Sequence, residues 1–413
     1  MEQKAPQQKR RWRWSWWTRV VAALLAFAMT FSLFLTNAVQ IKLGNNGQSA
    51  STDVLDETTD YVQKSAVSRA GDVIATLVTS PKTLQDYYRN ASIQIGQAKY
   101  ADALTSIKAC LSLADNAERS VRDELWLKCG ALETLTGAYD DALKSFTNIS
   151  VGTYRGEQLL IKAQIFDAKK DTEGVCAMLN EYVRLYPEEW NTRMTLAASY
   201  VQIEQYDSAI KQYDAIIDAG ADSGGTAYMQ RATARMMAGD YTASIKDFLA
   251  AMNAGYSDPS ACLAQCALSS YLLKDYKAVL GYGARAVAKG SKNFTFESLY
   301  YYMGLSQLNL GNYTEAAGLL TKAINLGVKM DDAYYYRGAC NMVNGSMQDA
   351  IVDFTTVIDR NVTELLSNSY FNRGVCEADQ KQFDLAKADL QRVMELEQKG
   401  ELYESAKTML GLL

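Results

Sequence analysis

The sequence predicts an all-α solenoid of about nine helical hairpins, on three regularities that run from residue 80 to the C-terminus. A pattern of glycine, aromatic, alanine and large residue recurs nine times, with some departures, and is complete in residues 137–146 (GAYDDALKSF). Small residues recur at one position with spacings of 33 to 39 residues. Two sets of glycines follow the same period. Such a period indicates units that bury their apolar faces only by stacking on their neighbours.

The small residues form a ladder with one member in each predicted hairpin. An aromatic follows nine positions later in seven of the nine hairpins, then usually an alanine, and then a large residue such as Phe146, Leu179, Tyr213, Phe248 or Phe354. Small side chains let two helices approach closely, and large ones fill the remaining space. The ladder consists of Ala91, Gly130, Ala163, Ala197, Ala232, Ala267, Gly304, Gly338 and Gly374.

The two glycine sets predict where helices end, because glycine readily takes the left-handed conformation of a helix stop. One set is expected to end the first helix of a hairpin: Gly137, Gly239, Gly311 and Gly345. The other is expected to end the second: Gly220, Gly255, Gly290 and Gly327. Residues 157–187 match least well, since Thr172 and Val175 replace the aromatic and the alanine. Residues 401–413 are expected to form a closing helix.

From about residue 84 to the C-terminus these features resemble the tetratricopeptide repeat (TPR), a 34-residue pair of antiparallel helices. The resemblance implies a right-handed superhelix whose concave groove is lined by the first helix of each pair and binds a protein or peptide. The chain departs from the family at the second turn. The family more often has proline there, and only Pro187 keeps it.

The resemblance also implies which residues line the groove. They form a largely apolar and aromatic candidate set: Met194, Met229, Met236, Tyr271, Tyr301, Leu308, Tyr335, Met342 and Phe371. Two interpretations remain open. The set either binds an extended or helical peptide with apolar anchors or packs against the opposite wall of a tight superhelix. The Lys, Arg and Asn that would clamp an acidic chaperone tail are absent from these positions.

Composition argues against several classes of function. The chain has no histidine, which removes the commonest general base and the commonest zinc ligand. Residues 1–40 hold 6 of the 42 Lys and Arg and 1 of the 47 Asp and Glu, so residues 41–413 carry a net charge of −10. An acidic body is a poor partner for nucleic acid. We therefore expect no catalysis, no metal, no cofactor and no nucleic acid.

The cysteines are expected to be thiols of the core rather than metal ligands or disulfides. Cys262 and Cys266 share one helix face and lack further ligands nearby, which favours small buried side chains. Cys340 and Cys376 occupy equivalent positions of adjacent hairpins, too far apart for a disulfide.

The N-terminus predicts a membrane anchor. Residues 20–39 carry no charge, and 20 helical residues span roughly 30 Å, the thickness of the hydrocarbon core. Residues 1–19 form a basic tail whose four tryptophans, Trp12, Trp14, Trp16 and Trp17, suit the membrane interface. The excess of positive charge before residue 20 places this tail in the cytoplasm and the repeats outside it. Residues 40–83 are expected to form a stalk and a lead-in helix before the solenoid of residues 84–413. A cleaved secretory signal is the alternative to an uncleaved anchor.

The favoured function is a single-pass membrane scaffold that binds a protein or peptide partner on the extracytoplasmic side. Its contact with the bilayer is residues 20–39. The alternative is a cell-surface or envelope module, anchored or secreted after signal cleavage, that binds a glycan or polymer through its 26 tyrosines.

Overall fold

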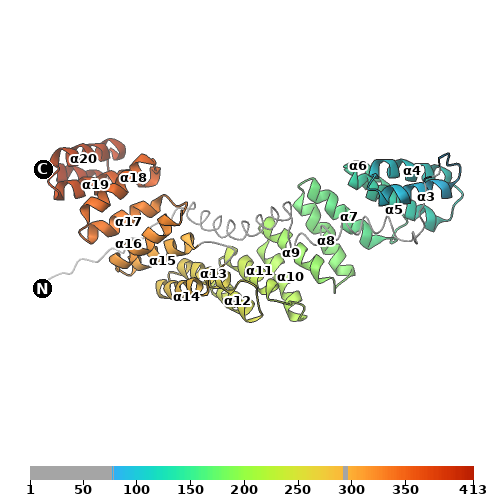
Figure 1. Ribbon diagram of the computed structural model, residues 1–413, viewed down its shortest axis with the longest axis horizontal. Coiled ribbons are helices and arrows are strands. Elements are labelled where there is room, and N and C mark those ends of the chain that lie inside the picture. The colour runs from blue at the N-terminus through green and yellow to red at the C-terminus, as the bar shows by residue number, and fades with distance from the viewer. Residues whose placement is uncertain (1–76, 78, 292–295) are drawn as a thin grey trace, which may run out of the picture. The chain divides into compact units, whose positions relative to one another are not determined.

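The computed structural model describes residues 77, 79–291 and 296–413, and every regular element in these ranges is helical. The chain divides into two compact units, Met1–Ala221 and Asp222–Leu413, called here the first and second unit. Figure 1 shows their helices in chain order. The repeat pattern alone does not predict this division.

In the first unit the described helices pair consecutively into four hairpins, each helix packed against its partner. They are α3 (Leu84–Gly96) with α4 (Tyr100–Leu113), α5 (Arg119–Leu135) with α6 (Tyr139–Thr147), α7 (Arg155–Ala168) with α8 (Thr172–Leu185), and α9 (Trp190–Gln202) with α10 (Tyr206–Asp218).

The second unit contains five more hairpins and the predicted closing helix, α21 (Glu401–Leu410). Its hairpins are α11 (Thr226–Met237) with α12 (Tyr241–Asn253), α13 (Pro259–Leu272) with α14 (Tyr276–Lys289), α15 (Glu297–Asn309) with α16 (Tyr313–Asn325), α17 (Asp332–Val343) with α18 (Met347–Asp359), and α19 (Leu366–Asp379) with α20 (Phe383–Glu397). A 3₁₀ turn, η1 (Thr363–Leu365), precedes α19. The prediction of an all-helical array of about nine hairpins is confirmed for the described residues.

The turn between the helices of each hairpin has one conformation throughout. Gly137, Gly239, Gly311 and Gly345 have φ between +80° and +89°, as predicted for left-handed helix stops. The other five hairpins force a non-glycine residue into the same conformation. These residues, with φ between +57° and +63°, are Ala98, Lys170, Glu204, Lys274 and Lys381. The left-handed region is unfavourable for residues with a Cβ, so these five turns carry local strain.

The second helix begins two residues after that turn. In seven hairpins its first residue is the predicted aromatic. The residue before it is an aspartate in three hairpins. Asp171, Asp240 and Asp275 each accept a hydrogen bond from a backbone N–H three residues later. This N-cap satisfies a donor that the helix itself cannot.

The predicted ladder packs against the large residue of the second helix. A Cβ at Gly130 would lie 2.5 Å from Cε1 of Phe146, and one at Gly304 would lie 2.8 Å from Cγ of Leu320. Both distances are too short for a real contact, so these sites admit only glycine without rearrangement. The hairpin α13/α14 is an exception. It has Gly283 at the large position, and Met303 from the next hairpin fills the space.

The weakest predicted repeat also forms a hairpin, α7 with α8. Its ladder residue Ala163 and its large residue Leu179 share one buried cluster, and in addition Phe166 of α7 packs directly over Gly174 of α8.

The predicted basic tail (1–19), transmembrane segment (20–39) and nearly all of the stalk lie outside the described residues, as do Trp12, Trp14, Trp16 and Trp17. Among the residues that are described, no helix combines the length and apolar character needed to cross a bilayer.

Candidate functional site

All nine candidate groove residues lie on first helices of hairpins, but they differ in accessibility. Met194 belongs to α9 of the first unit and is half-buried. The other eight belong to the second unit. Four of them are buried, with exposed fractions of 3 to 8%: Met229, Met236, Tyr271 and Tyr301. Four are half-buried and are called here the C-terminal stripe: Leu308, Tyr335, Met342 and Phe371.

The buried tyrosines of α13 and α15 pack on one another. The ring centroids of Tyr271 and Tyr302 are 4.9 Å apart, and those of Tyr301 and Tyr302 are 5.3 Å apart. Tyr301 donates its hydroxyl proton to Oδ2 of Asp332 at 2.8 Å. Because these side chains join α13, α15 and α17, they hold successive hairpins together.

Asp332 is the acid of this cluster. Burial raises its pKa, and the hydrogen bond from Tyr301 opposes that rise. Asp331 and Asp332 lie at the N-terminus of α17, where acids interact favourably with the helix dipole.

The C-terminal stripe combines packing with access to solvent. The Tyr335 ring lies 5.7 Å from that of Phe354, and the Tyr335 hydroxyl accepts a hydrogen bond from Nδ2 of Asn372 at 3.2 Å. Met342 packs beside the core formed by Ala350, Phe354 and Cys376. Phe371 packs beside the core under α21. One side of Tyr335, Met342 and Phe371 therefore supports the solenoid, and the remainder of each is exposed.

A set of buried ion pairs was missed by sequence reasoning. In three hairpins of the second unit, an arginine of the first helix pairs with an aspartate of the second. Arg231 Nη2 lies 2.7 Å from Oδ1 of Asp247, Arg337 Nη2 lies 2.6 Å from Oδ1 of Asp353, and Arg373 Nη2 lies 2.8 Å from Oδ1 of Asp389. Each aspartate is buried.

The signal for these pairs is present in the sequence. Each arginine directly precedes a ladder residue, and the aspartate follows that arginine by sixteen positions. Two of the arginines also reach the preceding hairpin. Arg337 donates to Thr321 Oγ1 at 3.3 Å, and Arg373 donates to Thr355 Oγ1 at 3.0 Å. These arginines therefore fix the stacking of neighbouring hairpins as well as the pairing within one.

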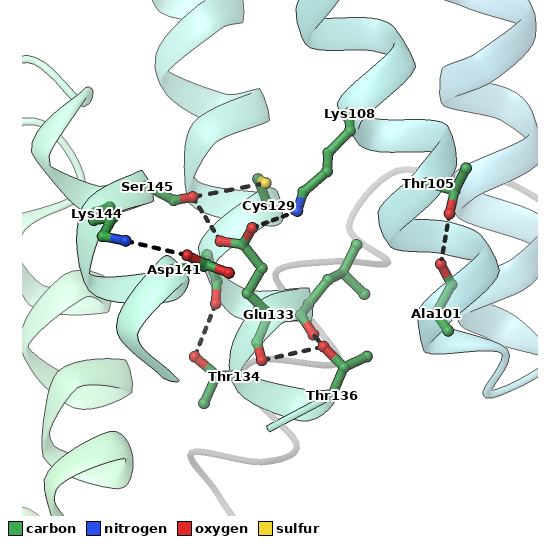
Figure 2. A network of polar contacts seen from close by, with 12 residues as sticks. Ala101, Thr105, Lys108, Cys129, Glu133, Thr134, Thr136, Asp141, Lys144 and Ser145 are labelled. Atoms are coloured by element: carbon green, nitrogen blue, oxygen red, sulfur yellow. Dashed lines mark hydrogen bonds and ion pairs between the residues drawn. The ribbon is translucent and has the colours of Figure 1, made fainter. Parts of the chain in front are cut away.

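The first unit places a different polar network between α4, α5 and α6, shown in Figure 2. The buried carboxylate of Glu133 lies 2.8 Å from Lys108 Nζ and accepts a hydrogen bond of 2.6 Å from Ser145 Oγ. Ser145 Oγ also lies 3.7 Å from Sγ of Cys129. Burial and the charge of Glu133 raise the pKa of the Cys129 thiol to about 12, so this sulfur stays protonated at neutral pH.

The other cysteines behave alike. All seven are free and buried, as predicted for thiols of the core. Burial raises the pKa of Cys262 and Cys266 to about 12 and that of Cys340 and Cys376 to about 11. Thiols with such pKa values are poor nucleophiles near neutral pH.

Comparison with known families assigns two segments of the chain. Residues 194–259 and 301–361 match the model of the tetratricopeptide repeat. Within these two segments the chain contains tetratricopeptide repeats. The second matched segment covers the hairpin α15/α16 from residue 301 and the hairpin α17/α18, and it includes three of the four residues of the C-terminal stripe. Tetratricopeptide repeats form quasi-one-dimensional stacks with extended binding surfaces and typically act as non-catalytic scaffolds.

Solved structures of repeat proteins resemble the chain at low identity. A tetratricopeptide repeat protein from Parabacteroides merdae is 18% identical, with 62% of this chain and 98% of that chain covered and a TM-score of 0.38. The C-terminal part of a TPR repeat-containing protein from Cytophaga hutchinsonii is 12% identical, with 59% and 97% covered and a TM-score of 0.49. A comparison with curated proteins found no significant match.

Proposed function

We propose that the chain is a membrane-anchored TPR scaffold that binds a protein or peptide partner on the extracytoplasmic side and performs no catalysis. The observation that carries the binding function is the C-terminal stripe. Its four apolar or aromatic residues are partly exposed on the first helices of three successive hairpins. A row of partly buried anchors of this kind suits an extended or helical peptide, whose side chains would occupy the spaces between the helices.

The buried members of the candidate set refine the proposal. Met229, Met236, Tyr271 and Tyr301 are already enclosed by the fold, so they stabilise the hairpins that support the stripe. Direct contact with a partner then falls to Leu308, Tyr335, Met342 and Phe371.

Photo-crosslinking in the native membrane tests the binding surface. Benzoylphenylalanine is introduced at Tyr335, with exposed Lys322 on α16 as the control position. A discrete protein adduct from Tyr335 alone, identified by mass spectrometry, is the expected result. A folded protein that gives no protein adduct at Tyr335, or equal adducts at both positions, contradicts the proposal.

The anchor and the orientation need a separate experiment. Residues 20–39 carry no charge and follow a basic tail, which supports a signal anchor with a cytoplasmic N-terminus. The full chain should resist carbonate extraction from membranes, and a chain that begins at residue 40 should not. Protease added to the outer side of intact membranes should digest the repeats. Extraction of the full chain by carbonate, or protection of the repeats, would contradict this part of the proposal.

A further inference from the structure

The three buried Arg–Asp pairs differ in the residue that follows the arginine by four positions. In α11 this residue is Arg235, whose Nη1 donates to Oδ2 of Asp247 at 2.7 Å. In α17 it is Asn341, whose Nδ2 donates to Oδ2 of Asp353 at 3.2 Å. Each of these buried aspartates thus receives a hydrogen bond from a second donor besides the paired arginine.

In α19 the equivalent residue is an acid, Glu377. It is 5% exposed, and its Oε2 atom has no hydrogen-bond partner within the described part of the chain. Its Oε1 lies 3.7 Å from Nε of Arg373, whereas the same nitrogen donates to Asp389 at 2.7 Å. Two buried acids therefore share one arginine, and the arginine directs its hydrogen bonds to Asp389. An ionised glutamate has no proton to donate, so only protonated Glu377 can take the role of Asn341.

We propose that Glu377 is a proton-binding site that holds a proton near neutral pH and then donates to Asp389, as Asn341 donates to Asp353. Loss of this proton places a second negative charge beside Asp389 and weakens the packing of α19 on α20. The last hairpin is thereby a pH-sensitive element, whereas the other two hairpins with a buried Arg–Asp pair have Arg235 and Asn341 at this position.

The surroundings of Glu377 agree with this assignment. Burial raises its pKa to about 7, the charge of Asp389 adds to the rise, and Arg373 opposes it. Helix α18, on the other side of α19, presents the neutral hydroxyl of Thr355 to Arg373. In the described ranges α17, α21 and η1 also touch α19, and they add no charge that shifts the pKa of Glu377.

The sign of the pH effect follows from the raised pKa. The folded hairpin binds the Glu377 proton more tightly than the unfolded chain, where the pKa is near 4.5. The stabilisation is therefore fully present below pH 4.5 and is lost as the pH rises through about 7. Between pH 6 and pH 8 the equilibrium for local opening should increase by at most about tenfold.

The effect should extend to α21. Leu390 and Val393 of α20 form one core with Ala406 of α21, and Phe371 packs against it. Loosening α20 therefore loosens the closing helix and one residue of the C-terminal stripe.

Hydrogen exchange of the full chain at pH 6 and pH 8, corrected for intrinsic exchange rates, tests this inference. Protection of α19 to α21 should fall up to about tenfold at pH 8 relative to α17 and α18, which have Asn341 instead of an acid. Glu377→Gln should abolish the fall and raise protection at pH 8. Glu395→Gln, at an exposed acid of α20, should behave like the wild type.

A reciprocal variant tests the inference even if Glu377→Gln does not fold. Asn341→Glu should confer the same pH dependence on α17 and α18. Equal pH profiles for the wild type and Glu377→Gln would overturn the inference. So would an Asn341→Glu protein whose α17 and α18 show no pH dependence.

Discussion

The two units share the small-residue ladder but fill the buried polar position of their hairpins differently. In the first unit two hairpins have a serine where the second unit has the aspartates of its buried ion pairs, at the seventh residue of the second helix. Ser106 is hydrogen-bonded to the Gln94 amide at 2.8 Å, and Ser145 to Glu133 at 2.6 Å. In the second unit three hairpins place an arginine and an aspartate there. The close packing of a small residue under a large one is thus what the repeat requires, and the polar contact beside it varies.

Breaking a buried ion pair should produce the largest effect. Asp353→Ala leaves Arg337 buried without its carboxylate, so we expect a loss of about 3–5 kcal/mol in the free energy of unfolding. Ser145→Ala removes one hydrogen bond to Glu133, which keeps its ion pair with Lys108, and should cost less, about 1.5–3 kcal/mol. Urea unfolding, monitored by far-UV circular dichroism, measures the free energy of unfolding of both variants. Equal costs would contradict the contrast between the units.

The ladder should be sensitive in both units. In Gly130→Ala the new methyl group would meet the ring of Phe146, so the variant should lose about 1–3 kcal/mol of stability. Gly318→Ala adds a methyl group in α16 with nothing within 4 Å, and should gain about 0.5–1 kcal/mol. Trp126 of α5 packs against the core that contains Phe146, so tryptophan fluorescence can follow the first variant. If Gly130→Ala instead stabilised the protein, position 130 and the Phe146 ring would not be closely packed, which contradicts this prediction.

The smallest effect concerns the strained turns. Lys274 has φ +63°, where Gly239 in the preceding hairpin has φ +89°. Lys274→Gly should relieve strain and stabilise the second unit by about 0.5–1 kcal/mol. Lys322→Gly, inside α16, should destabilise it by a similar amount. If thermal melting shows both variants destabilised, the turn at Lys274 is not strained.

Much of the fold follows from the sequence because the repeat rests on short-range patterns. The ladder, the aromatic first residue of the second helix and the four glycine turns all lie where periodicity predicts them. The other five turns have no glycine at the left-handed position and so gave no sequence signal. There the neighbouring helices impose the same left-handed conformation on residues such as Ala98 and Lys274. The hairpin α7/α8 was the weakest prediction because Thr172 and Val175 replace the aromatic and the alanine, and nothing in its sequence indicated that Phe166 would pack over Gly174.

The candidate site was predictable in position but not in accessibility. Periodicity places Tyr301 and Tyr335 at equivalent positions of α15 and α17, yet one is buried and the other half-buried. That difference depends on the neighbouring hairpins, such as the contact of Tyr301 with Asp332. The ion pairs needed only the spacing of sixteen between an arginine and an aspartate, which becomes recognisable once the ladder is aligned.

The central claim is that the C-terminal stripe, rather than exposed apolar surface in general, binds the partner. It is tested by measuring the Tyr335 photo-adduct in two charge variants, Met342→Glu in the stripe and Val352→Glu on α18. Val352 is 56% exposed and therefore a more accessible apolar residue than the half-buried Met342. With melting unchanged in both variants, Met342→Glu should abolish the adduct and Val352→Glu should leave it intact. An adduct that survives Met342→Glu, or that is lost equally in both, would contradict the account.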